Sequence, residues 1–195
     1  MVGTIRLLSV NTSVARPLMA GSRKVLSGIG KRSVPGPVTV WPLGLAGDEQ
    51  ADPAVHGGLA KALYAYPVEH YAYWQARRQA HGVSLFEESL PPGFAGENLT
   101  LQGVLEHQVW VGDELHFDGV VLRVTEPRQP CFKFVAVMGY PEAARDMLPQ
   151  ERCGFYLAVV RTGTIHAGDT CTLVPGRRAL GIPEAFAARR ARHLR

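Results

Sequence analysis

The dipeptide Asp118-Gly119, set between two short apolar segments, is the feature of this sequence that most restricts its fold. Both residues tolerate a positive φ, so the pair favours a tight hairpin turn that joins strands at 114–117 and 120–125. A related pattern, an apolar segment followed by Gly-Asp, occurs at 112–113 and again at 168–169. Repeated turns of this kind are typical of consecutive strands in a closed β structure.

Most of the remaining chain also runs in short apolar segments that glycine or proline interrupts. The other expected strands are 4–10, 38–45 with a bend at Pro42, 61–66, 155–161 and 171–174. Helical patterns are confined to 68–80, 131–147 and 183–193. Residues 11–35 show few regular signals, and we expect a functional loop there. The fold class that follows is β-rich α+β: a closed or partly closed β-barrel with a few peripheral helices and a short basic C-terminal helix.

The net charge of +4 comes from the C-terminal tail. Residues 177–195 hold six arginines and one acid, whereas the preceding 176 residues hold 15 basic and 16 acidic side chains. A nearly neutral body does not favour nucleic-acid binding. We therefore expect a barrel domain over 1–176 and a basic helical tail over 177–195. A solvated helix explains the tail best, and a partner contact or a weak electrostatic tether are the alternatives.

The cysteine pattern restricts the chemistry. Cys131, Cys153 and Cys171 are odd in number and include no Cys-x-x-Cys pair, which favours neither a disulfide framework nor a structural zinc site. The sequence has no signal-peptide pattern and no apolar run of membrane-spanning length. We therefore expect a soluble, cytoplasmic protein without a membrane partner.

Cys131 is the strongest candidate for chemistry, within the motif Pro-Arg-Gln-Pro-Cys-Phe-Lys at 127–133. A strand is expected to end at the first proline and a helix to begin after the second, which places the thiol at a helix N-terminus. Backbone N–H groups and the cations Arg128 and Lys133 favour the thiolate, the form that binds metals and attacks electrophiles. A buried structural cysteine is the alternative interpretation.

Two further segments carry candidate binding residues. Residues 47–61 combine acidic side chains with His56, Gly57-Gly58 and Lys61 directly before a strand. The glycines allow close approach of a ligand, and Lys61 can neutralise a phosphate. An acidic surface loop with a turn at the glycines explains the same residues. In the segment 91–100, Glu97 and Asn98 either hold a turn or contact a ligand.

The order and combination of these motifs resembles the MOSC domain family (molybdenum cofactor sulfurase C-terminal-like domains), and within it the stand-alone YiiM-type members. The resemblance runs from about Ile5 to Val174 and is most specific at 127–131 and 96–99. Residues 28–38 are also similar to the family's N-terminal loop. YiiM-type proteins usually carry a C-terminal three-helix extension, whereas the residues after 176 leave room for one helix of ~15 residues.

The resemblance implies a β-barrel that binds a molybdenum cofactor, a phosphorylated pterin whose dithiolene chelates the metal, in a plain or nucleotide-extended form. It implies an oxidoreductase that reduces N-hydroxylated compounds (hydroxylaminopurines, amidoximes and hydroxylamines) to amines, as in the detoxification of N-hydroxylated bases. Electrons would come from a separate flavin-containing protein, because the sequence shows no donor domain. The resemblance also allows a homodimer.

Each candidate site residue takes a role from this resemblance. The metal ligand is the thiolate of Cys131. The cations that hold the pterin phosphate and ring edges are Lys61, Arg128, and Lys31 or Arg32. The residues that line the pterin are His56, Gly57 and Gly58. The residues grouped as catalytic are Cys131, His56, Glu97 and Asn98, of which the last two shape the pocket beside the metal.

Other functions remain open from the residues alone. A sulfur-carrier or cofactor-handling protein would hold a persulfide on Cys131, and this is the leading alternative. A cysteine hydrolase would pair Cys131 with His56 and would need no metal. A non-catalytic binding module would use the basic tail to recruit a partner.

Overall fold

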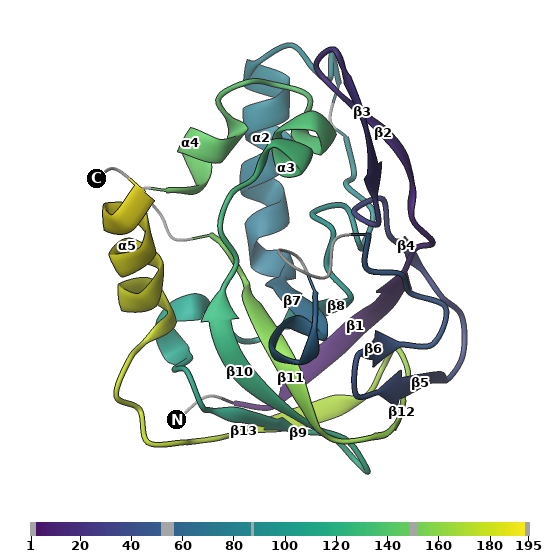
Figure 1. The fold of residues 1–195 in the computed structure, drawn as a ribbon, viewed down its shortest axis with the longest axis vertical. Helices are drawn as coiled ribbons and strands as arrows, with labels where there is room; N and C mark the ends of the chain where they lie inside the picture. The colour runs from purple at the N-terminus through teal and green to yellow at the C-terminus, as the bar shows by residue number, and fades with distance from the viewer. Residues whose placement is uncertain (1–2, 52–56, 87, 149–151, 194–195) are drawn as a thin grey trace.

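A computed structural model describes residues 3–51, 57–86, 88–148 and 152–193 of the chain. Seven of the strands in these ranges form a closed β-barrel (Figure 1), in the order β13 (Thr170–Val174), β9 (Glu114–His116), β10 (Val121–Pro127), β11 (Phe155–Arg161), β7 (Leu63–Pro67), β8 (Leu99–Gln102) and β1 (Ile5–Thr12). The barrel closes because β1 pairs with both β8 and β13. The predicted barrel is confirmed, and its closure pairs the two edges that an open sheet would expose.

The hairpin predicted at Asp118-Gly119 joins β9 to β10, which pair antiparallel. The Phe117 N–H donates to the Val120 carbonyl at 2.9 Å, and Gly119 has a φ of 84°. That backbone conformation favours glycine, because a β-carbon would crowd the backbone there. The Gly-Asp pairs at 112–113 and 168–169 also directly precede strands, β9 and β13.

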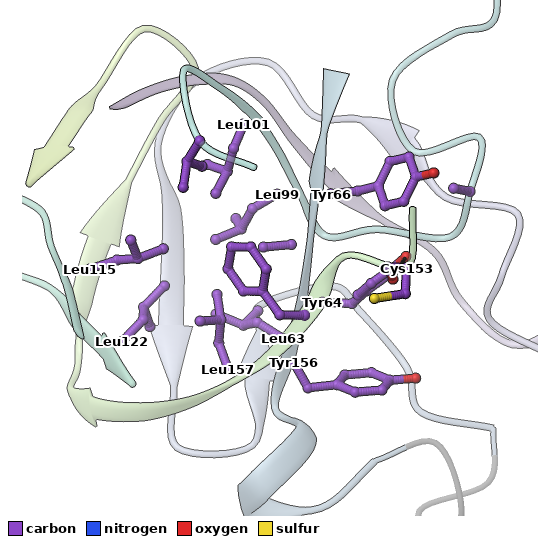
Figure 2. Packing of buried hydrophobic residues seen from close by; sticks show 14 of the residues in the cluster. Leu63, Tyr64, Tyr66, Leu99, Leu101, Leu115, Leu122, Cys153, Tyr156 and Leu157 are labelled. Atoms are coloured by element: carbon purple, nitrogen blue, oxygen red, sulfur yellow. Dashed lines mark hydrogen bonds between the residues drawn. The ribbon is translucent and has the colours of Figure 1, made fainter. Parts of the chain in front are cut away.

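Successive side chains along each strand point alternately into the barrel interior and toward its outer wall. Leu63 of β7 pairs with Leu157 of β11, and the adjacent residues Tyr64 and Tyr156 also pair, so the two pairs face opposite sides of the sheet. Figure 2 shows the leucines gathered in the interior and the tyrosines directed away from them. All four side chains are buried, so the outer wall must be covered as well.

Shorter strands surround the barrel. β2 (Arg16–Ala20) and β3 (Arg23–Ser27) form a hairpin, β4 (Arg32–Ser33) pairs with the end of β1, and a three-stranded sheet contains β5 (Val38–Trp41), β6 (Gly44–Leu45) and β12 (Gly163–Ile165). The expectation of an irregular loop over 11–35 is therefore wrong. Met19 and Leu26 are exposed in this hairpin, so its apolar and polar residues do not alternate as they do in a half-buried strand.

The helices α2 (Tyr71–Ala80), α3 (Phe132–Met138) and α4 (Ala143–Met147) lie together beyond one end of the barrel (Figure 1). The rings of Trp74 and Phe134 meet edge-on at 5.2 Å and join α2 to α3. The expected helical stretch 131–147 divides because Gly139, with a φ of 80°, ends α3. The described ranges also contain the short 3₁₀ helices η1 (Leu59–Lys61), η2 (Val68–His70) and η3 (Glu106–Gln108). In the ranges given above, no helix is both long enough and apolar enough to span a membrane.

The predicted C-terminal helix is present as α5 (Ile182–His193), and it packs against the barrel at β10. Ile182, Ala185 and Phe186 are buried on its inner face, at a spacing that one side of a helix shares. The Ile182 N–H donates to the Val109 carbonyl at 2.9 Å, and the Arg178 guanidinium pairs with the fully buried Asp113 at 3.2 Å. The interpretation as a solvated helix is wrong for this inner face.

Candidate functional site

A cavity of about 620 Å³, counting its part open to solvent, lies where the outward-facing Tyr64 and Tyr156 meet the loops around them. Segments that are distant in sequence line it: 27–31, 48–51, 61–64, 96–98, 128–133 and Tyr156. Each of the three motif-bearing segments singled out in the sequence therefore contributes to the wall of one cavity.

Cys131 lines this cavity from the start of α3. β10 ends at Pro127, Cys131 has an extended backbone, and the Val135 N–H donates to its carbonyl at 3.1 Å, so the helix begins directly after it. The thiol is half-buried and is not in a disulfide. The predicted placement of Cys131 at a helix N-terminus is confirmed.

Arg128 is a buried cation on the same wall. Its guanidinium lies 4.8 Å from the ring centre of Tyr64 and 5.1 Å from that of Phe134, and it donates to the Ala95 carbonyl. Burial opposes its charge, but the neighbouring Tyr64 and Cys131 favour the charge and hold the pKa above the ordinary guanidinium value. No carboxylate within the described ranges forms an ion pair with it, so the charge remains available to an anionic ligand.

Two lysines add to the positive charge of the cavity. Lys133, in the first turn of α3, is only 9% exposed and forms no ion pair with a residue that the structure describes. Lys61, at the end of η1, lies 3.3 Å from a carboxylate oxygen of Glu126 and 5.6 Å from the ring centre of Tyr156. A wall with these cations favours phosphate or another anion.

A polar network joins four of the cavity segments. Asp48 pairs with the Lys31 ammonium through one carboxylate oxygen and accepts from the Asn98 amide at 2.8 Å through the other. The carbonyl oxygen of the Asn98 side chain accepts from the Tyr64 N–H at 3.1 Å. Burial lowers the pKa of Lys31, and Asp48 opposes that shift. The network fixes segment 27–31 against β7 and keeps a fourth cation, Lys31, near the cavity.

Glu97 lies behind the cavity wall, whereas its neighbours Gly96 and Asn98 line the cavity. One oxygen of the fully buried Glu97 carboxylate accepts from the Tyr71 hydroxyl, from the Gly93 N–H at 2.8 Å and from the Thr100 hydroxyl at 2.9 Å. The other has no hydrogen-bond partner in the described part of the chain. Burial raises the pKa of Glu97, and the bond from Tyr71 opposes the shift. In this structure Glu97 holds the loop at 93–98 against the start of β8.

The other candidates from the sequence are placed less centrally. Gly58 donates its N–H to Gln50 at 2.9 Å, and neither Gly57 nor Gly58 lines the cavity. Arg32 is exposed in β4, so of the pair Lys31 or Arg32 it is Lys31 that faces the cavity. His56 lies outside the described residues. The roles assigned to these residues stay predictions.

Sequence reasoning did not assign a site role to Asp48, Gln50, Tyr64 or Tyr156, all of which line the cavity. Lys133, which the sequence analysis named as a cation beside the thiol, also lines the cavity, although no binding role was assigned to it. The tyrosines carry no comparable signal, because only the register of β7 against β11 brings them together.

A family comparison decides how this cavity is understood. Residues 52–172 match the MOSC domain. The chain belongs to the MOSC domain family. MOSC domains are associated with molybdenum cofactor binding. Among the residues that the structure describes, no group of three or more His, Cys, Asp or Glu gathers as a metal site. A metal that its cofactor already chelates needs few protein ligands. A single thiol in a cationic cavity therefore fits such a cofactor.

Individual relatives support the assignment to this family. The protein YiiM of Escherichia coli is 36% identical over 161 residues, which cover 83% of this chain and 70% of that protein. A protein named "Reductase" from Gibberella moniliformis is 34% identical over 152 residues, which cover 77% of this chain but 26% of the longer protein. The crystal structure of YiiM from Geobacillus stearothermophilus shares the fold with a TM-score of 0.72 at 30% identity, covering 97% of this chain and 85% of that one.

Proposed function

We propose that this MOSC domain binds a molybdenum cofactor in the Cys131 cavity and reduces N-hydroxylated compounds to amines. The observation that carries the proposal is the joint placement of a half-buried thiol with the buried cations Arg128 and Lys133, neither of which has a carboxylate partner in the described ranges. Such a wall fits a soft metal ligand beside an anionic group.

The residues of the cavity divide the work of holding the cofactor. Cys131 would supply its thiolate to the metal, and the cations that would hold the phosphate and ring edges are Lys61, Arg128 and Lys133. Asn98 and Lys31 are already engaged with Asp48 and would support the wall. Phosphate groups bind well to cations that are fixed before the ligand arrives, and the stacking of Arg128 between two rings fixes it.

The reaction needs two electrons and two protons, which convert an N–OH group to N–H and release water. When bound, the cofactor supplies the two-electron redox chemistry that side chains lack. The protein's residues would bind the cofactor and exclude water from its buried side. The electrons would come from a separate flavin-containing donor. The Gibberella protein, which this chain matches over 26% of that protein's length, is named a reductase, and the name supports a reductive role.

Metal and pterin content test the proposal directly. After expression in a host that makes the cofactor, the wild-type chain should contain near-stoichiometric molybdenum and give oxidised-pterin fluorescence. Cys131→Ser should retain less than about a tenth of the metal, because a hydroxyl is a poor substitute for a thiolate ligand. Cys171→Ala is the control, since this thiol is buried in β13 and does not line the cavity.

A folded wild-type chain without molybdenum or pterin would reject the proposal. The same cation-lined thiol would suit a persulfide, so the sulfur-carrier function is the alternative. Release of sulfane sulfur from the wild type but not from Cys131→Ser, in metal-free protein, would favour that alternative.

A further inference from the structure

The carboxylate of Glu126 in β10 is shared between the cavity and the C-terminal helix. One oxygen lies 3.3 Å from the Lys61 ammonium, and the other pairs with the Arg189 guanidinium of α5. The Glu126 side chain is only 11% exposed, against 23% for Lys61 and 43% for Arg189. A cation that lines the cavity and a cation from the tail therefore compete for the same largely buried negative charge.

The packing of α5 explains why Arg189 reaches this carboxylate. Ile182, Ala185 and Phe186 are buried, and Arg189 follows Phe186 by three positions, on the same side of the helix. α5 lies alongside β10, the strand that ends with Glu126 and Pro127 directly before the Cys131 motif (Figure 1). The apolar face of the helix thus sets the position of its arginine.

We propose that Arg189 is a positioning residue for the anion site of the cavity. By sharing the negative charge of Glu126, it weakens the attraction of Glu126 for the Lys61 ammonium, so an anion in the cavity meets weaker competition for that ammonium. Without Arg189, Glu126 would attract Lys61 more strongly and would present a less compensated negative charge beside the cavity. The proposal rests on the proposed function, since it takes the ligand of Lys61 to be the phosphate of the cofactor.

Binding of inorganic phosphate to the full-length chain, produced in a host without the cofactor, tests this by calorimetry. Arg189→Gln should weaken phosphate binding by about two- to fivefold, the range of a partly exposed ion pair. Glu126→Gln should strengthen phosphate binding by a similar factor, because the phosphate then no longer competes with a carboxylate for Lys61. In the Glu126→Gln background, Arg189→Gln should have no further effect. Arg189→Lys should restore most of the wild-type affinity.

The opposite changes in phosphate affinity expected for Arg189→Gln and Glu126→Gln separate this role from a purely structural one. If Arg189 merely anchored α5, Glu126→Gln would remove the same anchor and weaken binding as Arg189→Gln does. Arg178→Gln is the matched control: it removes another tail arginine, whose partner Asp113 does not line the cavity, and should leave phosphate binding unchanged. Equal losses in the two single variants, or no phosphate binding by the wild type, would overturn the proposal.

This experiment does not depend on the reductase function. A chain that lacks molybdenum yet shows the expected signs with phosphate would reject the proposed function and keep the role of Arg189. If the wild-type chain holds molybdenum but Arg189→Gln loses no phosphate affinity, the proposed function is kept and the role of Arg189 is rejected.

Discussion

Arg128 joins the structural and the chemical parts of the molecule in a single side chain. Its guanidinium lies over the rings of both Tyr64 and Phe134, and it faces the cavity that Cys131 lines. The motif Pro-Arg-x-Pro-Cys predicted a cation near the thiol. It could not predict the stacking, because both rings come from elsewhere along the chain. A lysine here would keep the charge but lose the planar group that two rings can hold.

Glu97 should make the stability of the protein depend on pH. Its folded-state pKa is raised above the ordinary value of 4.5, so the folded chain holds this proton more tightly than the unfolded chain does. The resulting stabilisation is complete below pH 4.5 and is lost as the pH rises through the raised pKa. Glu97→Gln, which resembles the protonated acid, should remove this loss, and urea unfolding at a series of pH values measures it.

Glu114→Gln serves as the control for that experiment. Hydrogen bonds from His116 and then Arg123 lower the pKa of Glu114, so its contribution is lost as the pH falls. The two variants should therefore change the pH profile in opposite directions. A Glu97→Gln profile that parallels the wild type would show that Glu97 keeps its charge in the folded protein.

At the scale of elements, the start of β11 depends on close approach to β7. A β-carbon at Gly154 would lie 2.4 Å from the Ala65 carbonyl oxygen and 2.8 Å from the Tyr64 and Tyr66 rings. Gly21 has nearly the same φ, 62° against 61°, but no atom within 4 Å of its β-carbon position. Gly154→Ala should therefore cost about 3 kcal/mol of unfolding free energy, and Gly21→Ala about 1 kcal/mol.

Chemical denaturation of the two alanine variants measures that difference. Because both carry the same backbone penalty, the excess at Gly154 reports the close approach alone. Equal costs would mean that β11 can shift away from β7 without loss.

The elements that the sequence predicted well are those whose signals are local. The hairpin at Asp118-Gly119 and the helix start after Pro130 follow from the conformational preferences of a few adjacent residues. The β2–β3 hairpin escaped prediction because Met19 and Leu26 face outward. The docking of α5 escaped it because the arginines of the tail conceal a short apolar face at Ile182 and Phe186.

For the whole molecule, the leucine interior of the barrel supports the cavity on its outer wall. Leu157 is fully buried in β11, next to Tyr156 of the cavity, and Val160 of the same strand is 48% exposed. Leu157→Ala should lower the free energy of unfolding by about 2–5 kcal/mol, because it leaves a void in a closed core. Val160→Ala should change it by less than about 1 kcal/mol. Urea unfolding compares them, and similar losses would mean that the interior is loosely filled.

The pairing of β1 with β13 has a consequence for the synthesis of the protein. β1 ends at Thr12 and β13 begins at Thr170, so translation must advance by most of the chain before the barrel can close. At ribosomal rates of about 5–20 residues per second, this interval is on the order of 10 s. Until then the nascent chain carries an apolar strand with an unpaired edge, and we expect ribosome-associated chaperones to bind it.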